Sequence, residues 1–195
     1  GARMMEFVKD PTRVVTVPAV ARSRHLVLLN RLVEAERLSE ESPFNKIVRI
    51  RGGGKPGVIA SSAAFNYAAD AAFALGLSAD ILKIGFSHPL PTKLVADFLR
   101  AHDTVMIAEE LEPVLETAVR AVAQRESLST KIVGKADGVL PRAFEFDQAI
   151  LSAALAKAFG LSRGDEATPA QAANLPVRPP VLCAGCPHRA PYYAV

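Results

Sequence analysis

The chain has 195 residues, and half of them are apolar, which is enough for one domain with a sizeable core and additional segments. Its net charge is +3 and its basic residues are scattered, so neither a nucleic-acid-binding protein nor an acidic tail is indicated. Two cysteines exclude a secreted disulfide framework, and no apolar run reaches the roughly 20 residues that a membrane span requires.

Residues 1–45 are predicted to form an N-terminal arm that contains one helix, at residues 21–38. The helix is indicated by apolar residues spaced at i, i+3 and i+7, namely Leu26, Leu29 and Val33. The run from Ser42 to Asn45 contains a proline and ends the helix. The first nine residues lack the apolar stretch of a signal peptide, so we expect a cytoplasmic protein.

Residues 46–162 are predicted to form an α/β domain, because short apolar strands alternate with amphipathic helices from Gly57 onward. The predicted strands are residues 57–61, 80–86, 104–108 and 131–133. The predicted helices span 62–75 and 145–159, and two more start at Pro91 and Pro113. Since crossovers between parallel strands are right-handed, we expect a three-layer α/β/α sandwich with a mainly parallel sheet of at least four strands.

The helix at 62–75 is predicted to start with Ser62 as its capping residue. We expect its inward face to carry four residues with helical spacing, namely Phe65, Ala69, Ala72 and Phe73. This assignment places both phenylalanines of the helix against the sheet.

Polar side chains follow three of the predicted strands, at the edge where ligands gather in parallel sheets. They are Ser61 and Ser62, Ser87 and His88, and the acidic group Glu109, Glu110 and Glu112. His88 is interpreted first as a loop histidine, and the acids as charges that match a helix N-terminus or contact a partner domain. A general-acid pair stays open, although no nucleophile accompanies it. Lys135 is predicted to be a solvated surface residue.

Residues 163–180 are rich in alanine and proline and are predicted to be a linker, and residues 181–195 are expected to begin another domain. That segment holds the two cysteines, Cys183 and Cys186, with His188 and Arg189 directly behind them. Two thiolates on one turn suit half of an iron–sulfur site, or half of a zinc site with His188 as a third ligand. A thioredoxin-like dithiol is disfavoured, and two free thiols remain an alternative. Because either metal site needs four ligands, we expect a piece of a longer protein.

The motifs together resemble the indolepyruvate ferredoxin oxidoreductases, a family of thiamine-diphosphate-dependent enzymes. The run from Cys183 to Arg189 is similar to the Cys-Pro-Gly-Cys-Pro-His-Arg signature that opens the family's thiamine-diphosphate domain, with Ala184 in place of proline as in pyruvate:ferredoxin oxidoreductases. Further matches follow in the family's order along nearly the whole chain: residues 7–11, 42–45, 81–85, 89–91, 108–113 and 131–135.

The resemblance implies an enzyme that oxidatively decarboxylates aryl pyruvates to acyl-CoA and reduces ferredoxin, using thiamine diphosphate, Mg²⁺ and 4Fe–4S clusters. It implies that Cys183 and Cys186 are cluster ligands, and that His188 and Arg189 lie near thiamine diphosphate. The rest of the chain then corresponds to a middle domain like the transketolase C-terminal domain, without the magnesium–diphosphate motif and inactive alone. Such a domain would hold catalytic domains in register in a homo-oligomer, with Glu109, Glu110 and His88 at its interfaces.

The opposing hypothesis is a stand-alone α/β interaction module that binds zinc through Cys183, Cys186 and His188. The reading frame of the gene discriminates the two. Continuation past Val195 into a thiamine-binding motif favours the enzyme, and a stop codon favours the module.

Overall fold

The computed structural model describes residues 7–162 and 181–194. The chain divides into two units, Gly1–Arg163 and Gly164–Val195. The predicted linker at 163–180 lies outside the described residues. None of the described helices is long and apolar enough to cross a membrane.

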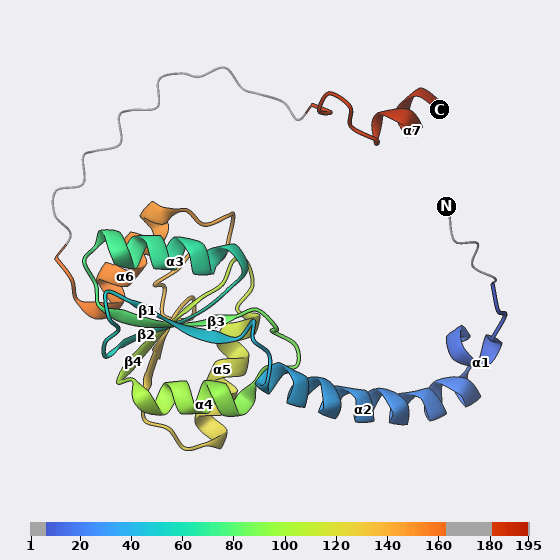
Figure 1. Cartoon of the computed structure of the whole chain (residues 1–195), viewed down its shortest axis with the longest axis horizontal. Coiled ribbons are helices and arrows are strands. Elements are labelled where there is room, and N and C mark those ends of the chain that lie inside the picture. The colour runs from blue at the N-terminus through green and yellow to red at the C-terminus, as the bar shows by residue number, and fades with distance from the viewer. Residues whose placement is uncertain (1–6, 163–180, 195) are drawn as a thin grey trace. The chain divides into compact units, whose positions relative to one another are not determined.

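The first unit is built around a five-stranded sheet with the strand order β1-β3-β2-β4-β5 (Figure 1). The strands are β1 (Lys46–Ile50), β2 (Pro56–Ser61), β3 (Ala79–Ile84), β4 (Thr104–Ala108) and β5 (Lys131–Val133). β2, β3, β4 and β5 are parallel to one another, and β1 pairs antiparallel with β3 at the edge. The predicted four-stranded parallel sheet is therefore confirmed, and β1 is an additional strand that the sequence analysis did not find.

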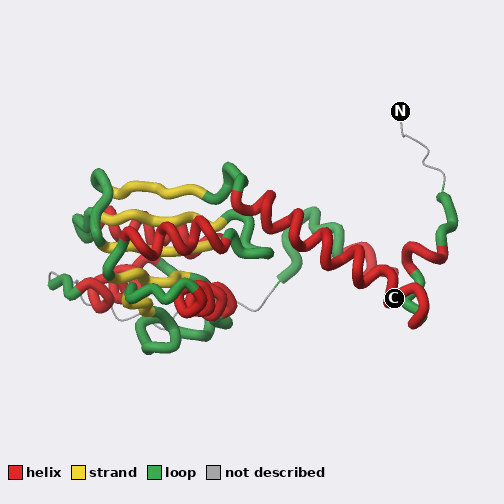
Figure 2. The backbone as a smooth tube through the Cα atoms, turned by 90° about the horizontal axis from the view of Figure 1, so that it is seen from below, coloured by secondary structure: helices red, strands yellow, loops and turns green. Residues whose placement is uncertain are grey.

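Helices cover both faces of this sheet (Figures 1 and 2). α3 (Ser62–Ala74) and α6 (Gln148–Phe159) pack with Val58, Ala60, Ile81 and Met106 on one face. α4 (Thr92–Ala101) and α5 (Val114–Arg125) pack with Ile59, Leu82, Val105 and Ile107 on the other face. Side chains alternate between the faces along each strand, so consecutive apolar residues supply both cores. The three-layer sandwich is confirmed.

The inward face of α3 agrees with the prediction in part, because Ala72 is buried and Phe65 and Ala69 are partly buried against the core. Its buried residues are four alanines, Ala64, Ala68, Ala71 and Ala72, while Phe73 is 64% exposed. Alanines let the helix approach the sheet and α6 closely, where a phenylalanine ring would hold them apart. The capping prediction is also wrong: Ser62 is the first helical residue, with φ +53°, and the N-cap position is Ser61, which makes no side-chain capping bond.

Two helices precede the sheet, α1 (Pro11–Val14) and α2 (Pro18–Glu40). α2 is fastened at its C-terminal end, where the Ser39 hydroxyl donates to the Phe86 carbonyl over 3.0 Å. The Glu40 carboxylate accepts from the backbone N–H groups of Lys93 and Leu94 at 2.6 and 3.0 Å, so it caps the N-terminus of α4. Figure 2 shows this helix leading into β1.

A buried asparagine completes the junction between the arm and the sheet. The Asn45 side-chain carbonyl accepts from the N–H groups of Gly85 and Phe86 at 2.8 and 2.9 Å. Its amide donates to the Ser39 carbonyl at 2.8 Å. One side chain therefore ties the end of α2 to the loop that follows β3.

Candidate functional site

The loops that follow β2, β3 and β4 meet at one edge of the sheet, as expected for parallel strands. A cavity of about 310 Å³ lies there, and its lining includes Ser61, Ser87, His88, Glu109 and Leu115. The structure therefore brings together residues from all three groups that the sequence placed at this edge. His88 and Ser87 are exposed, whereas Glu109 is buried.

Glu109 follows β4 and caps the N-terminus of α5. Its two carboxylate oxygens accept from the backbone N–H groups of Leu115 and Glu116, at 2.7 and 2.8 Å. These N–H groups have no partner within the helix, and the positive end of the helix dipole favours a negative charge beside them. Both oxygens of Glu109 are thus engaged as acceptors, which agrees with the helix-matching interpretation.

The other two acids of this group fasten the segment that follows β5. A carboxylate oxygen of Glu110 accepts from the backbone N–H of Phe146 at 2.8 Å. Glu112 is exposed and forms an ion pair with Arg142. The acidic group therefore holds the loop between β5 and α6 against the start of α5.

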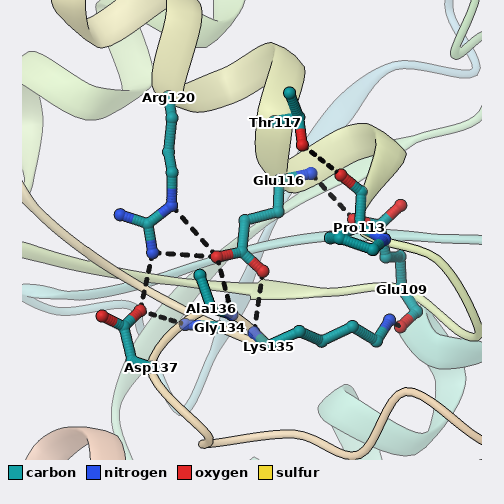
Figure 3. Close-up of polar contacts among 9 residues, drawn as sticks. All are labelled: Glu109, Pro113, Glu116, Thr117, Arg120, Gly134, Lys135, Ala136 and Asp137. Carbon is teal, nitrogen blue, oxygen red and sulfur yellow. Dashed lines mark hydrogen bonds and ion pairs between the residues drawn. The ribbon is translucent and has the colours of Figure 1, made fainter.

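A buried carboxylate that the sequence analysis missed lies next to this edge (Figure 3). The side chain of Glu116, in α5, is only 2% exposed. One of its oxygens accepts from the Arg120 guanidinium at 2.8 Å, and the other accepts from the backbone N–H of Lys135 at 2.7 Å. Arg120 also pairs with Asp137 at 2.6 Å. Glu116 and Arg120 are spaced i, i+4, which usually marks an exposed pair on a helix surface, so the sequence gave no sign of burial.

The partners of Glu116 shift the acid–base properties of Arg120. Burial alone would lower the pKa of Arg120, but its hydrogen bond to Glu116 and the charge of Asp137 raise that pKa above its ordinary value. The guanidinium therefore stays charged, and it compensates the charge of the buried carboxylate.

Lys135 is buried, so its prediction as a solvated surface residue is wrong. Its ammonium group donates to the Glu109 carbonyl and lies 5.2 Å from the centre of the Phe146 ring. Burial lowers the pKa of Lys135, and the surrounding acids, Glu109 first among them, oppose that change. The sequence could not show this, because the contacts of Lys135 come from the loop after β4, from α5 and from the segment before α6.

The second unit presents Cys183 and Cys186 on one turn, as the sequence indicated. The N–H of Cys186 donates to the Cys183 carbonyl at 3.1 Å, and Gly185 has φ +76°, which a glycine adopts without steric cost. The Cys186 sulfur lies 3.3 Å from Nδ1 of His188, and both thiols are free. Cys183 is exposed and Cys186 is partly buried.

Arg189 begins the short helix α7 (Arg189–Ala194) directly after this turn. Its N–H donates to the Cys186 carbonyl at 3.1 Å, and its side chain lines a surface hollow with Val181, Leu182 and Tyr193. Within residues 7–162 and 181–194, no group of three or more His, Cys, Asp and Glu side chains is arranged to hold a metal ion. This turn therefore provides two thiols, and one imidazole beside Cys186, as possible ligands for a soft metal.

No protein-family model matches the chain. Several curated relatives do match it, and all three that follow are named indolepyruvate oxidoreductase subunit IorA. The subunit from Methanothermobacter thermautotrophicus is 40% identical over 200 residues, which is 100% of this chain and 32% of the relative. Those from Archaeoglobus fulgidus and Thermococcus kodakarensis are 35% and 36% identical, over 98% and 97% of this chain and 30% of each relative.

The chain is homologous to one segment of these IorA subunits. The relationship to indolepyruvate oxidoreductases, expected from the motifs, is confirmed. The chain spans about a third of the length of the relatives it matches. Among solved structures, a protein described as "Split gene transketolase, inactive beta4 tetramer" superposes with a TM-score of 0.46 and 21% identity, over 60% of this chain and 43% of that one.

Proposed function

We propose that this chain is a structural domain of an indolepyruvate oxidoreductase, positioned between the catalytic parts of that enzyme and inactive by itself. The observation that carries the proposal is the match of the whole chain to one segment of the IorA subunits at 33–40% identity. The enzyme would oxidatively decarboxylate an aryl pyruvate, form the acyl-CoA and pass electrons to ferredoxin. We place it in the cytoplasm as a homo-oligomer.

Two of the three helix N-termini at the carboxyl edge of the sheet are closed to the diphosphate of thiamine diphosphate. A diphosphate is commonly bound by free N–H groups at a helix N-terminus. At this edge the N-termini of α4 and α5 are already filled by the carboxylates of Glu40 and Glu109. Negative charge at these two positions repels a phosphate, whereas the N-terminus of α3 has no side-chain cap. His188 and Arg189 are proposed to approach that cofactor, with Mg²⁺, on another part of the enzyme.

The Cys183–Cys186 turn fits half of an iron–sulfur site by the chemistry of its donors. Cysteine thiolates are the usual ligands of [4Fe–4S] clusters, and the turn holds two of them close together. Such a cluster, completed by two further ligands, would transfer single electrons. The His188 imidazole lies 3.3 Å from the Cys186 sulfur, within hydrogen-bond reach of that ligand.

Among the residues at the carboxyl edge, we separate those that stabilise the fold from the one proposed to contact a neighbouring domain. The carboxylates of Glu109 and Glu110 are engaged in capping α5 and in binding the N–H of Phe146. His88 is exposed beside the cavity, so we assign the contact with a neighbouring domain to His88 first. The proposed role of this edge is to position the domain, with no proton transfer of its own.

The test starts from the gene. Its reading frame on both sides of these codons should encode a thiamine-binding motif, and the protein expressed from the whole frame should oxidise indolepyruvate with ferredoxin as acceptor. A frame confined to these residues, giving a protein that binds one zinc ion tightly, would support the stand-alone module instead and overturn the proposal.

A second measurement tests the cluster ligands in the same whole protein. We expect Cys183→Ser and Cys186→Ser to remove the electron paramagnetic resonance signal of one reduced cluster and to stop electron transfer to ferredoxin. Ala184→Ser, on the same turn, is the matched control and should leave the signal intact. A full cluster signal in both cysteine variants would rule out these ligands.

A further inference from the structure

Helix α2 carries an apolar stripe that the first unit leaves uncovered. Leu26, Leu29 and Val33 are 66%, 46% and 71% exposed. Their spacing of three and four residues places them on one side of the helix, as in a helix–helix seam. Ser39, near the C-terminal end, is the buried residue of this helix in the structure as described. Val27, Leu28 and Leu38 are exposed as well, at 38%, 50% and 47%, so this helix of roughly 35 Å presents a large uncovered apolar surface, which suits a partner.

The two ends of α2 carry opposite charge. Residues 18–31 contain Arg22, Arg24 and Arg31 and no acid, which gives +3. Residues 34–41 contain Glu34, Glu36, Glu40, Glu41 and Arg37, which gives −4 + 1 = −3. Leu26 and Leu29 lie within the basic segment, and Val33 lies between the basic and the acidic segments, the two poles of the helix. The same side of the helix continues into a basic residue at one end and an acidic residue at the other. Arg22 lies four residues before Leu26, and Glu36 lies three residues after Val33.

We propose that α2 is an interface between two copies of this chain, packed antiparallel through Leu26, Leu29 and Val33. Two parallel copies would place like poles side by side, which is repulsive. Two antiparallel copies place the basic end of each helix against the acidic end of the other, and the same patch serves both copies around a two-fold axis. The helix is therefore complementary to itself in one orientation.

The acidic pole keeps charge available for a partner. Glu36 and Glu40 are used within the chain, since Glu36 accepts from the Thr92 hydroxyl at 2.9 Å and Glu40 caps α4. Glu34 and Glu41 are exposed and share one cation, Arg37, at 2.8 and 2.6 Å. Two carboxylates with a single arginine between them retain negative charge that the arginines of a second copy can approach.

This inference does not depend on the proposed oxidoreductase function, and it is tested on the 195-residue chain alone. Sedimentation equilibrium at low ionic strength should show a monomer–dimer equilibrium. Leu26→Ser with Leu29→Ser should raise the dissociation constant by at least about tenfold, because the seam loses apolar area. Val27→Ser, on a different side of the same helix, is the matched control and should dimerise as the unmodified chain does. Circular dichroism melting should show the same fold in all three proteins.

Charge reversal tests the orientation. Arg22→Glu with Arg24→Glu makes the basic end acidic, and Glu34→Arg with Glu41→Arg makes the acidic end basic. Each variant alone should dimerise on the order of tenfold more weakly, whereas an equimolar mixture should form heterodimers, since opposite poles meet again. A monomeric unmodified chain at high concentration, an unchanged dimer after the leucine substitutions, or a failure of the mixture to recover affinity would each overturn the proposal.

Discussion

The polar groups of the sandwich and those of the cysteine turn are organised in opposite ways. At the carboxyl edge of the sheet, Glu109 and Glu116 are buried and each accepts several hydrogen bonds from the same unit. On the turn, Cys183 is exposed and the Cys186 thiol has His188 as its polar neighbour. Groups whose bonding is complete within the fold serve stability, and groups with free bonding capacity are suited to a ligand.

The largest effect should follow removal of the buried carboxylate. Glu116→Ala leaves the N–H groups of Lys135 and Ala136 without their acceptor and removes one of the two carboxylate partners of Arg120, which keeps Asp137. We expect the free energy of unfolding to fall by about 3 kcal/mol, because backbone donors lose their buried acceptor and the truncated side chain leaves a cavity. Urea denaturation followed by circular dichroism measures this.

Glu112→Gln is the matched control for that substitution, because Glu112 is an exposed acid of the same region paired with one arginine. It should leave the unfolding midpoint unchanged. An equal loss of unfolding free energy in the two variants would mean that the buried Glu116 stabilises the fold no more than an exposed acid does. The contrast with the cysteine turn would then fail.

A smaller loss is expected from Gly134→Ala, which crowds the same carboxylate. A Cβ atom at Gly134 would lie 2.4 Å from one Glu116 oxygen, too close for any real contact. We expect a cost of about 2 kcal/mol, since either the loop or Glu116 must move. In a Glu116→Ala background the same substitution should cost less than about 1 kcal/mol, so a double-mutant cycle measured by urea denaturation should be strongly non-additive. Additive losses would contradict the contact.

The strands of the sheet and the charged residues around α5 show what the sequence could and could not predict. Continuous apolar runs identified the four parallel strands, because strands buried on both faces need apolar residues throughout. β1 was missed, since Lys46–Ile50 lies at the edge of the sheet and mixes charged with apolar residues. The helix-matching interpretation of Glu109 agrees with the structure because α5 follows within a few residues, while its contact with a partner domain stays a prediction. Glu116 and Lys135 were not interpreted as buried, because each is buried by segments distant in the sequence, and only the fold brings these together.

A pH-dependent effect should distinguish Lys135 from a surface lysine. Burial lowers its pKa below the ordinary 10.5, so between that lowered value and 10.5 the unfolded chain binds more protons than the folded chain. The contribution of Lys135 to the free energy of unfolding therefore rises with pH across this window. We expect Lys135→Met to reduce the gain in stability between about pH 7 and about pH 10, measured by urea denaturation at each pH. Lys93→Met, at an exposed site, should leave that gain unchanged, and equal gains in all three proteins would contradict the burial of Lys135.

The smallest effect on stability is expected for Cys183 and Cys186, which are the proposed cluster ligands. In the 195-residue chain, Cys183→Ser with Cys186→Ser should change the free energy of unfolding by less than about 0.5 kcal/mol, because Cys183 is exposed, Cys186 is only partly buried and serine is close in size to cysteine. A chelator should not lower the melting temperature of the unmodified chain, since folding that required zinc would be coupled to metal binding. Scanning calorimetry with and without chelator, together with elemental analysis, measures both. A large chelator-induced drop in melting temperature with one metal ion per chain would make the cysteine turn part of the fold, and the contrast between the two regions would then fail.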